Sequence, residues 1–345
     1  MKEASFYERM DGDRVRCALC HHRCRIPESQ TGRCGVRQNK GGKLYSLVYG
    51  KAVSQNVDPI EKKPLFHLYP GSGAFSIATM GCNFTCLHCQ NADISQFPRE
   101  EHRIAGKDLA PDQVVSLARQ HHCRSIAYTY TEPTVFFEYA YDTARLASEA
   151  GIKNVWVTNG YVTREALETV HPYLDAANVD LKAFTEDFYR EICGARLAPV
   201  LDGLQRMKSL GIWVEVTTLI IPSLNDSEGE LGEIARFILS LGAETPWHVS
   251  AFYPTHRLTD PPRTPVSTLR KARAIGLEAG LRYVYCGNAP GEDGENTYCF
   301  LCGKCLIRRI GYRIAEYHLK GGRCAFCGNE MDGIFETGAE RTRDW

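Results

Sequence analysis

The sequence predicts an α/β fold in which a parallel sheet curls toward a partial (β/α)6 TIM-like barrel between two small cysteine-rich flanks. Short apolar runs alternate with helical patterns through the middle of the chain, and closely spaced cysteines gather near both ends. The length of 345 residues is enough for one large core plus small appendages. We expect a metal-binding segment at residues 1–40, the barrel at 41–290 and a small paired-cysteine domain at 291–345.

Six short apolar runs, rich in β-branched and aromatic residues, are the predicted strands. They lack polar alternation, as strands buried on both faces of a parallel sheet do. A seventh run at 282–286 follows a helical pattern at 268–279, and the sequence does not settle whether this run joins the barrel. The six predicted strands span residues 74–79, 125–130, 154–158, 177–182, 212–220 and 247–253.

The segments between these runs carry helix start and stop signals. Asp112 is the expected N-cap of the first helix. A second helix is expected to begin at Thr134 and to end at Gly151. A third is expected to begin after Ser227 and to close at Gly242. Successive βα units of this kind predict a parallel sheet with its strands in chain order.

Charge and hydropathy argue against several classes of protein. The 41 Lys and Arg balance 41 Asp and Glu, and a formal charge of zero argues against a strongly basic nucleic-acid-binding surface. Glu3 and Glu8 do not fit a secretory signal, and no apolar run is long enough to span a membrane. We therefore expect a cytoplasmic protein without membrane attachment. Thiols stay reduced there, so the 15 cysteines are better explained as metal ligands than as disulfides.

Three cysteines lie directly after the first predicted strand. Cys82, Cys86 and Cys89 have the spacing Cys-x3-Cys-x2-Cys within the segment GCNFTCLHC. The loop that carries them should lie at the carboxyl ends of the strands, where such folds place their active sites. Four thiolates would close a [4Fe-4S] cluster, whereas three leave one iron open to an outside ligand. The sequence therefore predicts a reactive iron–sulfur site on this loop.

This loop resembles the signature of the radical S-adenosylmethionine (SAM) superfamily. The resemblance implies that the amino and carboxylate groups of SAM bind the open iron. It also implies that an electron from the cluster splits SAM into methionine and a 5′-deoxyadenosyl radical, which abstracts hydrogen from a substrate. An external reductant of the flavodoxin or ferredoxin type is implied as well.

The same resemblance assigns SAM contacts near the first two predicted strands. His88 stands where an aromatic residue usually packs near the adenine, with an exposed loop histidine as the alternative. Glu132 in YTYTEP is a candidate partner for the SAM ammonium, since the family usually has Gly-Gly-Glu-Pro there. Tyr130 and Thr131 replace the two glycines, so a backbone contact at Thr131 is the less secure part of this assignment.

Later strand ends supply the remaining SAM-contact candidates. Asn159 follows the third predicted strand, and Lys182 ends the fourth. Buried lysines are rare unless paired or functional, so Lys182 is expected to meet a ligand carboxylate, with a structural salt bridge as the alternative. Asp180 points to the same side and is its candidate partner. His256 resembles a SAM-contacting histidine of glycyl-radical-enzyme activases, and a surface histidine is an equal alternative.

The C-terminal cysteines form two copies of the turn Cys-x2-Cys-Gly. Paired turns of this kind resemble a zinc ribbon, in which four thiolates hold one structural zinc ion. Cys305 lacks the following glycine and is left out, although it could substitute for one ligand. A structural role is preferred over nucleic-acid binding because the excess positive charge of this segment is small. The predicted zinc ligands are Cys299, Cys302, Cys324 and Cys327.

The N-terminal segment has four cysteines spaced by two, three and nine residues. This spacing does not choose between zinc and an auxiliary [4Fe-4S] cluster, and zinc is the preferred interpretation. His21 or His22 could replace one thiolate. The predicted ligands are Cys17, Cys20, Cys24 and Cys34.

Besides the terminal ribbon, nearly the whole chain carries further motifs: VRCALCHHRC, IEKKPLFHLYPGS, GCNFTCLHCQN, YTYTEPTVFFEY, VDLKAF and LIIPSLND. With these motifs the chain resembles the radical SAM enzymes of the AmmeMemoRadiSam system, relatives of pyruvate formate-lyase activating enzymes. This implies partners of the AMMECR-like and Memo-like families and leaves the substrate unidentified. Lys62, Lys63 and His67 lie close to the cysteine loop in sequence; a cover over the active site is one interpretation of this block, and solvated charges are the preferred one. The alternative function is a non-catalytic metal-binding protein that acts through its ribbon. The cysteines left as reduced thiols are Cys123, Cys193, Cys286 and Cys305.

Overall fold

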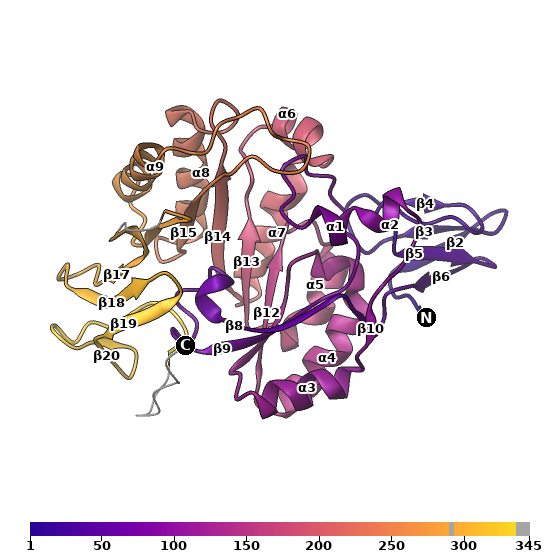
Figure 1. The fold of residues 1–345 in the computed structure, drawn as a ribbon, viewed down its shortest axis with the longest axis horizontal. Helices are drawn as coiled ribbons and strands as arrows, with labels where there is room; N and C mark the ends of the chain where they lie inside the picture. Colours follow the sequence, from indigo (N-terminus) through magenta and orange to yellow (C-terminus); the bar gives the residue numbers. More distant parts are fainter. Residues whose placement is uncertain (290–292, 336–345) are drawn as a thin grey trace.

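A computed structural model describes residues 1–289 and 293–335 and is built around one eight-stranded sheet (Figure 1). Seven of these strands are parallel, and one antiparallel strand pairs with the first of them at an edge. The α/β class with a mainly parallel sheet is therefore confirmed. The sheet runs in the order β8 (Ser54–Pro59), β9 (Gly73–Ala78), β11 (Ser125–Tyr128), β12 (Lys153–Thr158), β13 (Ala176–Asp180), β14 (Trp213–Ile220), β15 (Trp247–Ala251) and β16 (Val284–Gly287).

The parallel strands occupy the predicted runs. Every residue of β9 and β11 is buried, as the absence of polar alternation indicated. The seventh run forms β16, which joins the sheet beside β15. The edge strand β8 was not predicted, because it is polar and largely accessible along its outer half.

Helices connect the parallel strands and cover the sheet (Figure 1). The connecting helices have apolar faces directed at the strands, so their burial stabilises the core. Three further helices, each of only three or four residues, lie near the carboxyl ends of the strands. The helices are α1 (Ala92–Ser95), α2 (Phe97–Glu100), α3 (Pro111–Gln120), α4 (Phe137–Glu149), α5 (Arg164–Val170), α6 (Glu186–Phe188), α7 (Ala198–Ser209), α8 (Glu228–Leu241) and α9 (Val266–Glu278).

The predicted helix boundaries are partly confirmed. The Ser227 hydroxyl accepts the Glu230 amide at 3.2 Å and caps α8, and Gly242 closes that helix. Asp112 is not an N-cap, because α3 already begins at Pro111 and Asp112 lies in its first turn. The predicted start at Thr134 falls in a short 3-10 turn that leads into α4.

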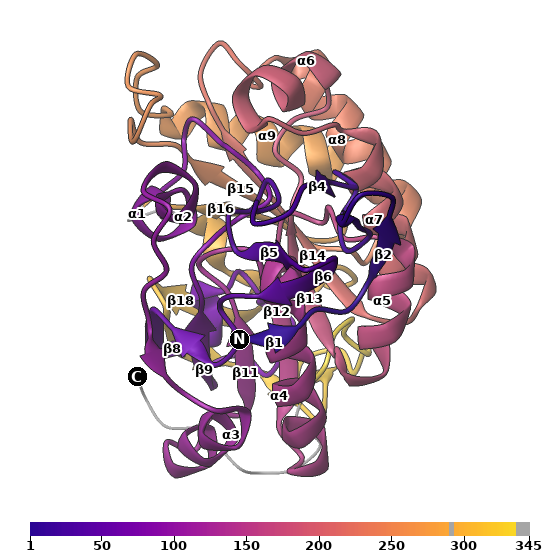
Figure 2. The ribbon, with the colours of Figure 1, turned by 90° about the vertical axis from the view of Figure 1, so that its right-hand side faces the viewer.

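The N-terminal strands form small antiparallel sheets at one end of the molecule, on the right in Figure 1 and toward the viewer in Figure 2. One of them, β6, pairs with both β1 and β5, so this part continues past the predicted boundary at residue 40. The strands are β1 (Lys2–Glu3), β2 (Tyr7–Met10), β3 (Arg14–Cys17), β4 (Arg25–Ile26), β5 (Arg37–Lys40), β6 (Lys43–Ser46) and β7 (Lys51–Ala52), the last paired with β10 (Lys107–Asp108).

A buried ion pair anchors these N-terminal strands to α4. The Arg37 guanidinium donates to both carboxylate oxygens of Glu138, at 2.9 and 3.0 Å, and to the Ser5 carbonyl at 2.7 Å. Arg37 is 1% exposed and Glu138 is 3% exposed. A bidentate pair of this kind is strong and directional, so it holds the N-terminal segment in one position on the barrel.

The C-terminal strands lie at the opposite end of the molecule (Figure 1). They pack against the residue 60–69 segment through Arg309, whose guanidinium donates to the Phe66 carbonyl at 3.0 Å and lies 3.6 Å from the buried Glu61. The described C-terminal strands are β17 (Thr297–Tyr298), β18 (Cys305–Ile310), β19 (Arg313–Tyr317), β20 (Leu319–Lys320) and β21 (Arg323–Cys324). Residues 336–345 of the predicted C-terminal domain lie outside the described part of the chain.

The prediction that the Lys62–His67 segment is solvated is wrong for two of its three polar side chains. Lys63 is 1% exposed and its ammonium lies 2.7 Å from the Asp58 carboxylate. His67 is fully buried, with Nδ1 2.6 Å from the Asp332 carbonyl and Nε2 2.6 Å from the Tyr285 hydroxyl. Lys62 keeps part of its side chain in solvent. Burying Lys63 and His67 costs little free energy because their polar groups have hydrogen-bond partners.

Among the described residues, no helix is both long and apolar enough to cross a membrane.

Candidate active site at the carboxyl ends of the strands

The loop with the central cysteines follows β9 and is held in place by a second segment. Its Thr85 amide donates to the Cys193 carbonyl at 2.8 Å, and its Leu87 amide donates to the Ile192 carbonyl at 2.9 Å. Both carbonyls belong to a single-turn π-helix, Tyr189–Cys193. The backbone of the cysteine loop is therefore fixed by a segment about a hundred residues away in sequence.

Gly194 ends this π-helix and allows the close approach. Its φ is +67°, and a Cβ there would lie 2.1 Å from Thr85 Oγ1. We expect Gly194→Ala to destabilise the protein and to lower its iron content after reconstitution, because the loop must move. Gly151→Ala is the matched control, since Gly151 has φ +73° with open space around it and carries only the left-handed strain of about 1–2 kcal/mol. Equal losses in unfolding free energy and iron for both variants would contradict this role of Gly194.

Hydrogen-bond donors surround two of the three central sulfurs. Cys82 Sγ accepts the Phe84 amide at 3.4 Å and lies 3.9 Å from the side-chain amide of Asn159. Cys89 Sγ lies 3.1 Å from the Ser95 hydroxyl. Burial raises the pKa of both thiols, and these donors oppose that effect by stabilising the thiolate, which is the form that ligates metal.

The third sulfur, that of Cys86, lies near a thiol that the sequence left unassigned. A hydrogen bond from Cys193 lowers the pKa of Cys86 against the effect of burial, and the Lys182 charge lowers it further. Burial opposes the charge on Lys182, but the nearby Asp180 carboxylate raises the lysine pKa well above its ordinary value. The Lys182 ammonium lies 2.7 Å from Asp180. The salt bridge considered from the sequence is therefore present, and its cation faces the cysteine loop.

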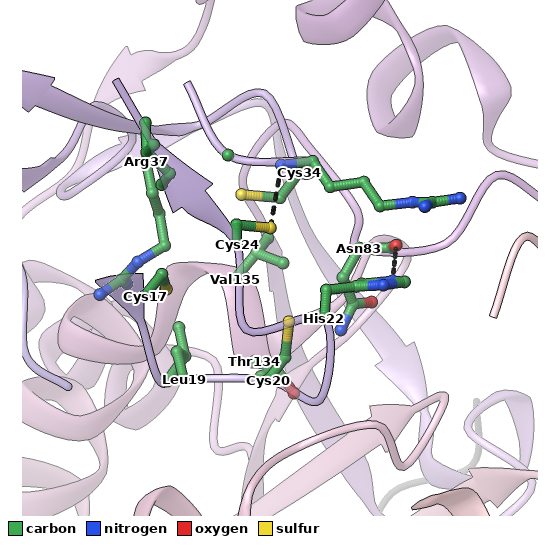
Figure 3. Close-up of a pocket in the computed structure, with 13 residues that line it drawn as sticks. Cys17, Leu19, Cys20, His22, Cys24, Cys34, Arg37, Asn83, Thr134 and Val135 are labelled. Carbon is green, nitrogen blue, oxygen red and sulfur yellow. Dashed lines mark hydrogen bonds between the residues drawn. The ribbon is translucent and has the colours of Figure 1, made fainter. Parts of the chain in front are cut away.

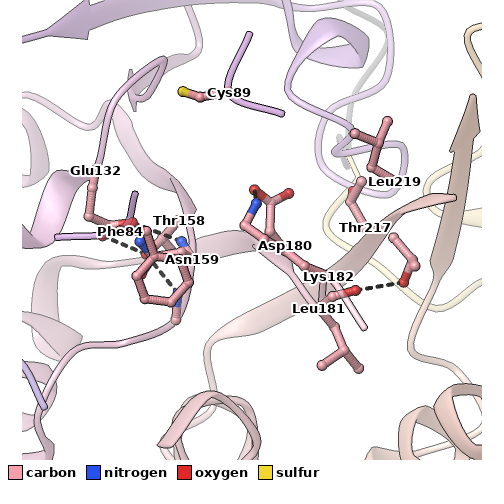
Figure 4. Close-up of polar contacts among 12 residues, drawn as sticks. Phe84, Cys89, Glu132, Thr158, Asn159, Asp180, Leu181, Lys182, Thr217 and Leu219 are labelled. Atoms are coloured by element: carbon pink, nitrogen blue, oxygen red, sulfur yellow. Dashed lines mark hydrogen bonds and ion pairs between the residues drawn. The ribbon is translucent and has the colours of Figure 1, made fainter. Parts of the chain in front are cut away.

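Glu132 lies at the centre of a hydrogen-bond network between β11 and β12 (Figure 4). Its Oε1 accepts the Thr134 amide, the Thr134 hydroxyl and the Thr158 hydroxyl at 3.0, 2.6 and 2.7 Å. Its Oε2 accepts the Asn159 amide at 2.8 Å. Burial raises the pKa of Glu132, and these donors oppose that effect. The network joins the ends of two neighbouring strands beside the cysteine loop.

His88 is buried, so the alternative of an exposed loop histidine is wrong. The residue is 4% exposed, and its ring centre lies 6.2 Å from that of Phe188. Burial lowers the pKa of His88 to about 3, with a contribution from the Lys182 charge. Its Nδ1 is a buried nitrogen without a hydrogen-bond partner in the described protein. A neutral ring with one unused nitrogen is consistent with a ligand-facing position.

One of the two residues that replace the family's glycines, Tyr130, keeps a glycine-like backbone. Tyr130 has φ +63°, a left-handed conformation that glycine adopts without strain. Its carbonyl accepts the Asn91 side-chain amide at 2.7 Å, and its hydroxyl donates to Asp58. The Thr131 hydroxyl donates to the Thr79 carbonyl at 2.8 Å. These hydrogen bonds fix the turn at Tyr130 and Thr131 although both residues are larger than glycine.

His256 lies on an exposed loop and stays a prediction as a SAM contact. The loop nevertheless reaches the cysteine loop, because the Arg257 amide donates to the Leu87 carbonyl at 2.9 Å. The Arg257 guanidinium also lies 2.6 Å from Glu100 in α2.

Two buried residues of this region were missed in the sequence. Asn83 lies between the motif cysteines, is 1% exposed and accepts the Asn159 side-chain amide at 2.7 Å. Its place inside the motif was a usable signal. Cys193 was grouped with the unassigned thiols, and no local pattern distinguishes it from Cys286, which lies at the edge of the sheet.

The C-terminal cysteines have the geometry of a mononuclear metal site. Among the described residues, these four form the one group of three or more potential ligands whose ligand atoms all lie within 4.8 Å of one another. Two cross pairs, Cys299 with Cys327 and Cys302 with Cys324, have sulfurs 3.7 and 3.8 Å apart. Tetrahedral zinc with Zn–S bonds of about 2.3 Å requires S···S distances of about 3.8 Å. Cys305 is not a member of the group.

The chain is similar to known proteins over most of its length. The profile of the radical SAM superfamily matches residues 76–238. An uncharacterized protein of Methanocaldococcus jannaschii, MJ0808, is 48% identical over 335 residues, which cover 96% of this chain and 99% of that protein. The pyruvate formate-lyase-activating enzyme of Clostridium pasteurianum is 24% identical over 167 residues, which cover 47% of this chain and 67% of the enzyme.

A solved structure agrees on the fold alone. Streptococcus suis SuiB, in complex with its precursor peptide SuiA, superposes with a TM-score of 0.51 and 13% identity, over 67% of this chain and 52% of SuiB. The matched profile covers the cysteine loop and most of the parallel sheet that carries it. The chain thus belongs to the radical SAM superfamily of enzymes.

Proposed function

We propose that Cys82, Cys86 and Cys89 hold a [4Fe-4S] cluster with one open iron, and that this iron binds SAM. The observation that carries the proposal is the three-cysteine loop after β9, beside the strand ends that bear Glu132 and Lys182. When bound, the cluster supplies the electron that cleaves SAM to methionine and a 5′-deoxyadenosyl radical, which takes hydrogen from a substrate.

The strand ends supply polar groups suited to the amino-acid part of SAM. Oε1 of Glu132 already accepts three hydrogen bonds, whereas Oε2 accepts one, so Oε2 is the oxygen with capacity left for an ammonium. The Asn159 side-chain amide donates toward Cys82 and Asn83 and orients this wall of the site. Lys182, held by Asp180, offers a cation for a carboxylate.

The remaining SAM contacts proposed are His88, Thr131 and His256. The buried ring of His88 offers an apolar face for the adenine and a free Nδ1. The Thr131 backbone precedes Glu132 directly, in the turn that the hydrogen bond from the Thr131 hydroxyl to the Thr79 carbonyl fixes. Burial of His88 and Glu132 keeps water away from a radical that would react with solvent.

Anaerobic reconstitution with iron and sulfide, followed by dithionite and SAM, tests this function. We expect 5′-deoxyadenosine and methionine in equal amounts, measured by liquid chromatography and mass spectrometry. A reconstituted protein that carries iron but releases no 5′-deoxyadenosine would favour the alternative, a metal-binding protein without catalysis.

For the substrate, we propose a partner-dependent reaction within the AmmeMemoRadiSam system, with AMMECR-like and Memo-like proteins as partners and a flavodoxin- or ferredoxin-type reductant. The resemblance of sequence segments along the chain supports this, and similarity to an activating enzyme supports a protein glycine as the first substrate to test. Deuterium transfer into 5′-deoxyadenosine from a labelled protein, RNA or small molecule distinguishes the substrate classes. No transfer from labelled protein would exclude the glycyl reaction.

We also propose that Cys299, Cys302, Cys324 and Cys327 hold one structural zinc ion. The S···S distances of 3.7 and 3.8 Å support it. We expect Cys299→Ala/Cys327→Ala to lose about one zinc per chain and to retain its iron, with a lower melting temperature. Cys305→Ala, as the control, should retain the zinc. Loss of iron instead of zinc in the double variant, measured by elemental analysis, would contradict the assignment.

A further inference from the structure

The four N-terminal cysteines line one cavity beside the barrel (Figure 3). Two of the four, Cys17 and Cys34, are buried, and the other two are partly buried. Apolar side chains such as Leu19 and Val135 complete the wall. A cavity with four thiols and an apolar lining can enclose a metal group away from solvent.

The spacing of the sulfurs differs from that of the zinc-type site in the same chain. No three of the four N-terminal sulfurs all lie within 4.8 Å of one another, whereas the described C-terminal sulfurs do. One zinc ion draws its four thiolates to about 3.8 Å. A [4Fe-4S] cubane places four irons and four sulfides between its ligands, so its cysteine sulfurs stand farther apart. The central cysteine loop shares this wider spacing.

Donors around the cavity fit an anionic group. The Arg33 backbone amide donates to Cys24 Sγ at 3.5 Å. Hydrogen bonds to cluster sulfurs of this kind tune iron–sulfur centres.

Two buried side chains that line the cavity have unused donors. Arg37 and Asn83 are each 1% exposed. The Nε of Arg37 and the Nδ2 of Asn83 have no hydrogen-bond partner in the described protein. Buried donors of this kind normally find an acceptor, and the sulfides and thiolates of a cluster would provide one.

The cavity adjoins the loop with the central cysteines. His22 Nε2 lies 2.8 Å from the Asn83 carbonyl, and the Asn83 side chain lines the cavity. Gly81, just before Cys82, has φ +98°, and a Cβ there would lie 3.0 Å from the Cys34 carbonyl. Asn83 therefore belongs to the central cysteine loop and also lines the N-terminal cavity, so the two cysteine groups adjoin.

We propose that Cys17, Cys20, Cys24 and Cys34 bind a second [4Fe-4S] cluster next to the SAM-binding one. This differs from the zinc preferred from the sequence spacing alone, and it rests on the sulfur spacing together with the unused donors of Arg37 and Asn83. Four cysteines close the cluster, so this second site has no open iron and binds no SAM.

The test uses the full chain with the central cysteines removed, Cys82→Ala/Cys86→Ala/Cys89→Ala. After anaerobic reconstitution we expect about four iron and four sulfide per chain with about one zinc, and the absorption and electron paramagnetic resonance (EPR) signals of a [4Fe-4S] cluster. The variant Cys17→Ala/Cys20→Ala/Cys24→Ala/Cys34→Ala should instead retain the central cluster and its SAM-dependent signal.

A triple variant that contains no iron and about two zinc ions per chain would overturn the proposal of a second cluster. Such a result leaves the proposed function intact if the wild type still holds about four iron and cleaves SAM. The opposite failure is distinct, since a triple variant that keeps all the iron of the wild type would overturn the central site and support the second one. Should the quadruple variant not fold, the metal content of the triple variant decides alone.

Discussion

Cys86→Ala is expected to abolish reductive cleavage of SAM, with a loss of more than about 100-fold in 5′-deoxyadenosine formed. A cluster needs its three thiolates, and two leave it open to loss or to a changed geometry. Cys193 and Lys182 both favour the thiolate of Cys86, which is the form that ligates metal. The product is measured in a single anaerobic incubation with dithionite.

Cys123→Ala is the matched control for this variant. Cys123 is also a buried cysteine, and burial alone raises its pKa to about 11. Its sulfur lies near the His121 carbonyl at the end of α3, outside the three cysteine groups. We expect full activity from this control. Equal product from Cys86→Ala and the wild type would rule out the cysteine loop as the reactive site.

Glu138→Ala is expected to destabilise the protein by about 3–5 kcal/mol, because it leaves the Arg37 charge buried without its partner. Both carboxylate oxygens are lost, including the one that accepts the Ser5 amide at 2.7 Å. Chemical denaturation measures the change in unfolding free energy. We also expect this substitution to weaken the packing of the N-terminal strands. The iron content of the N-terminal cysteine site should fall as well, since Arg37 lines its cavity.

Two further variants test whether the loss of stability in Glu138→Ala comes from the burial of the Arg37–Glu138 ion pair. Glu316→Ala removes a carboxylate that lies 3.0 Å from Arg308 in an exposed pair, and solvent screening should make that loss far smaller. Arg37→Met/Glu138→Leu removes both buried charges and should recover part of the stability. A similar loss from Glu138→Ala and Glu316→Ala would contradict the anchoring role of the buried pair.

Local signals in the sequence were sufficient for much of the barrel. The buried runs became β9 and β11 to β16 because strands covered on both faces must be apolar throughout. The cap at Ser227 was also correct, because capping depends on neighbouring residues. β8 was missed because an edge strand with an exposed outer half carries no such pattern.

Burial of polar residues depends on partners that are distant in sequence. His67 is buried through Asp332 and Tyr285, which lie more than two hundred residues away. Cys193 reaches the cysteine loop only because the π-helix packs on it. The positions of the central cysteines, Glu132 and Lys182 on one edge followed from strand order, whereas the separation of the N-terminal sulfurs became visible only in three dimensions.

EPR of the reduced wild type with and without SAM tests the central claim most directly. The claim is that three cysteines leave one iron of the central cluster open to SAM. We predict that SAM changes the spectrum of the reduced protein, and that the change is absent from Cys82→Ala/Cys86→Ala/Cys89→Ala. Superimposable wild-type spectra with and without SAM, or the same SAM-dependent change in the triple variant, would contradict an open iron at these cysteines.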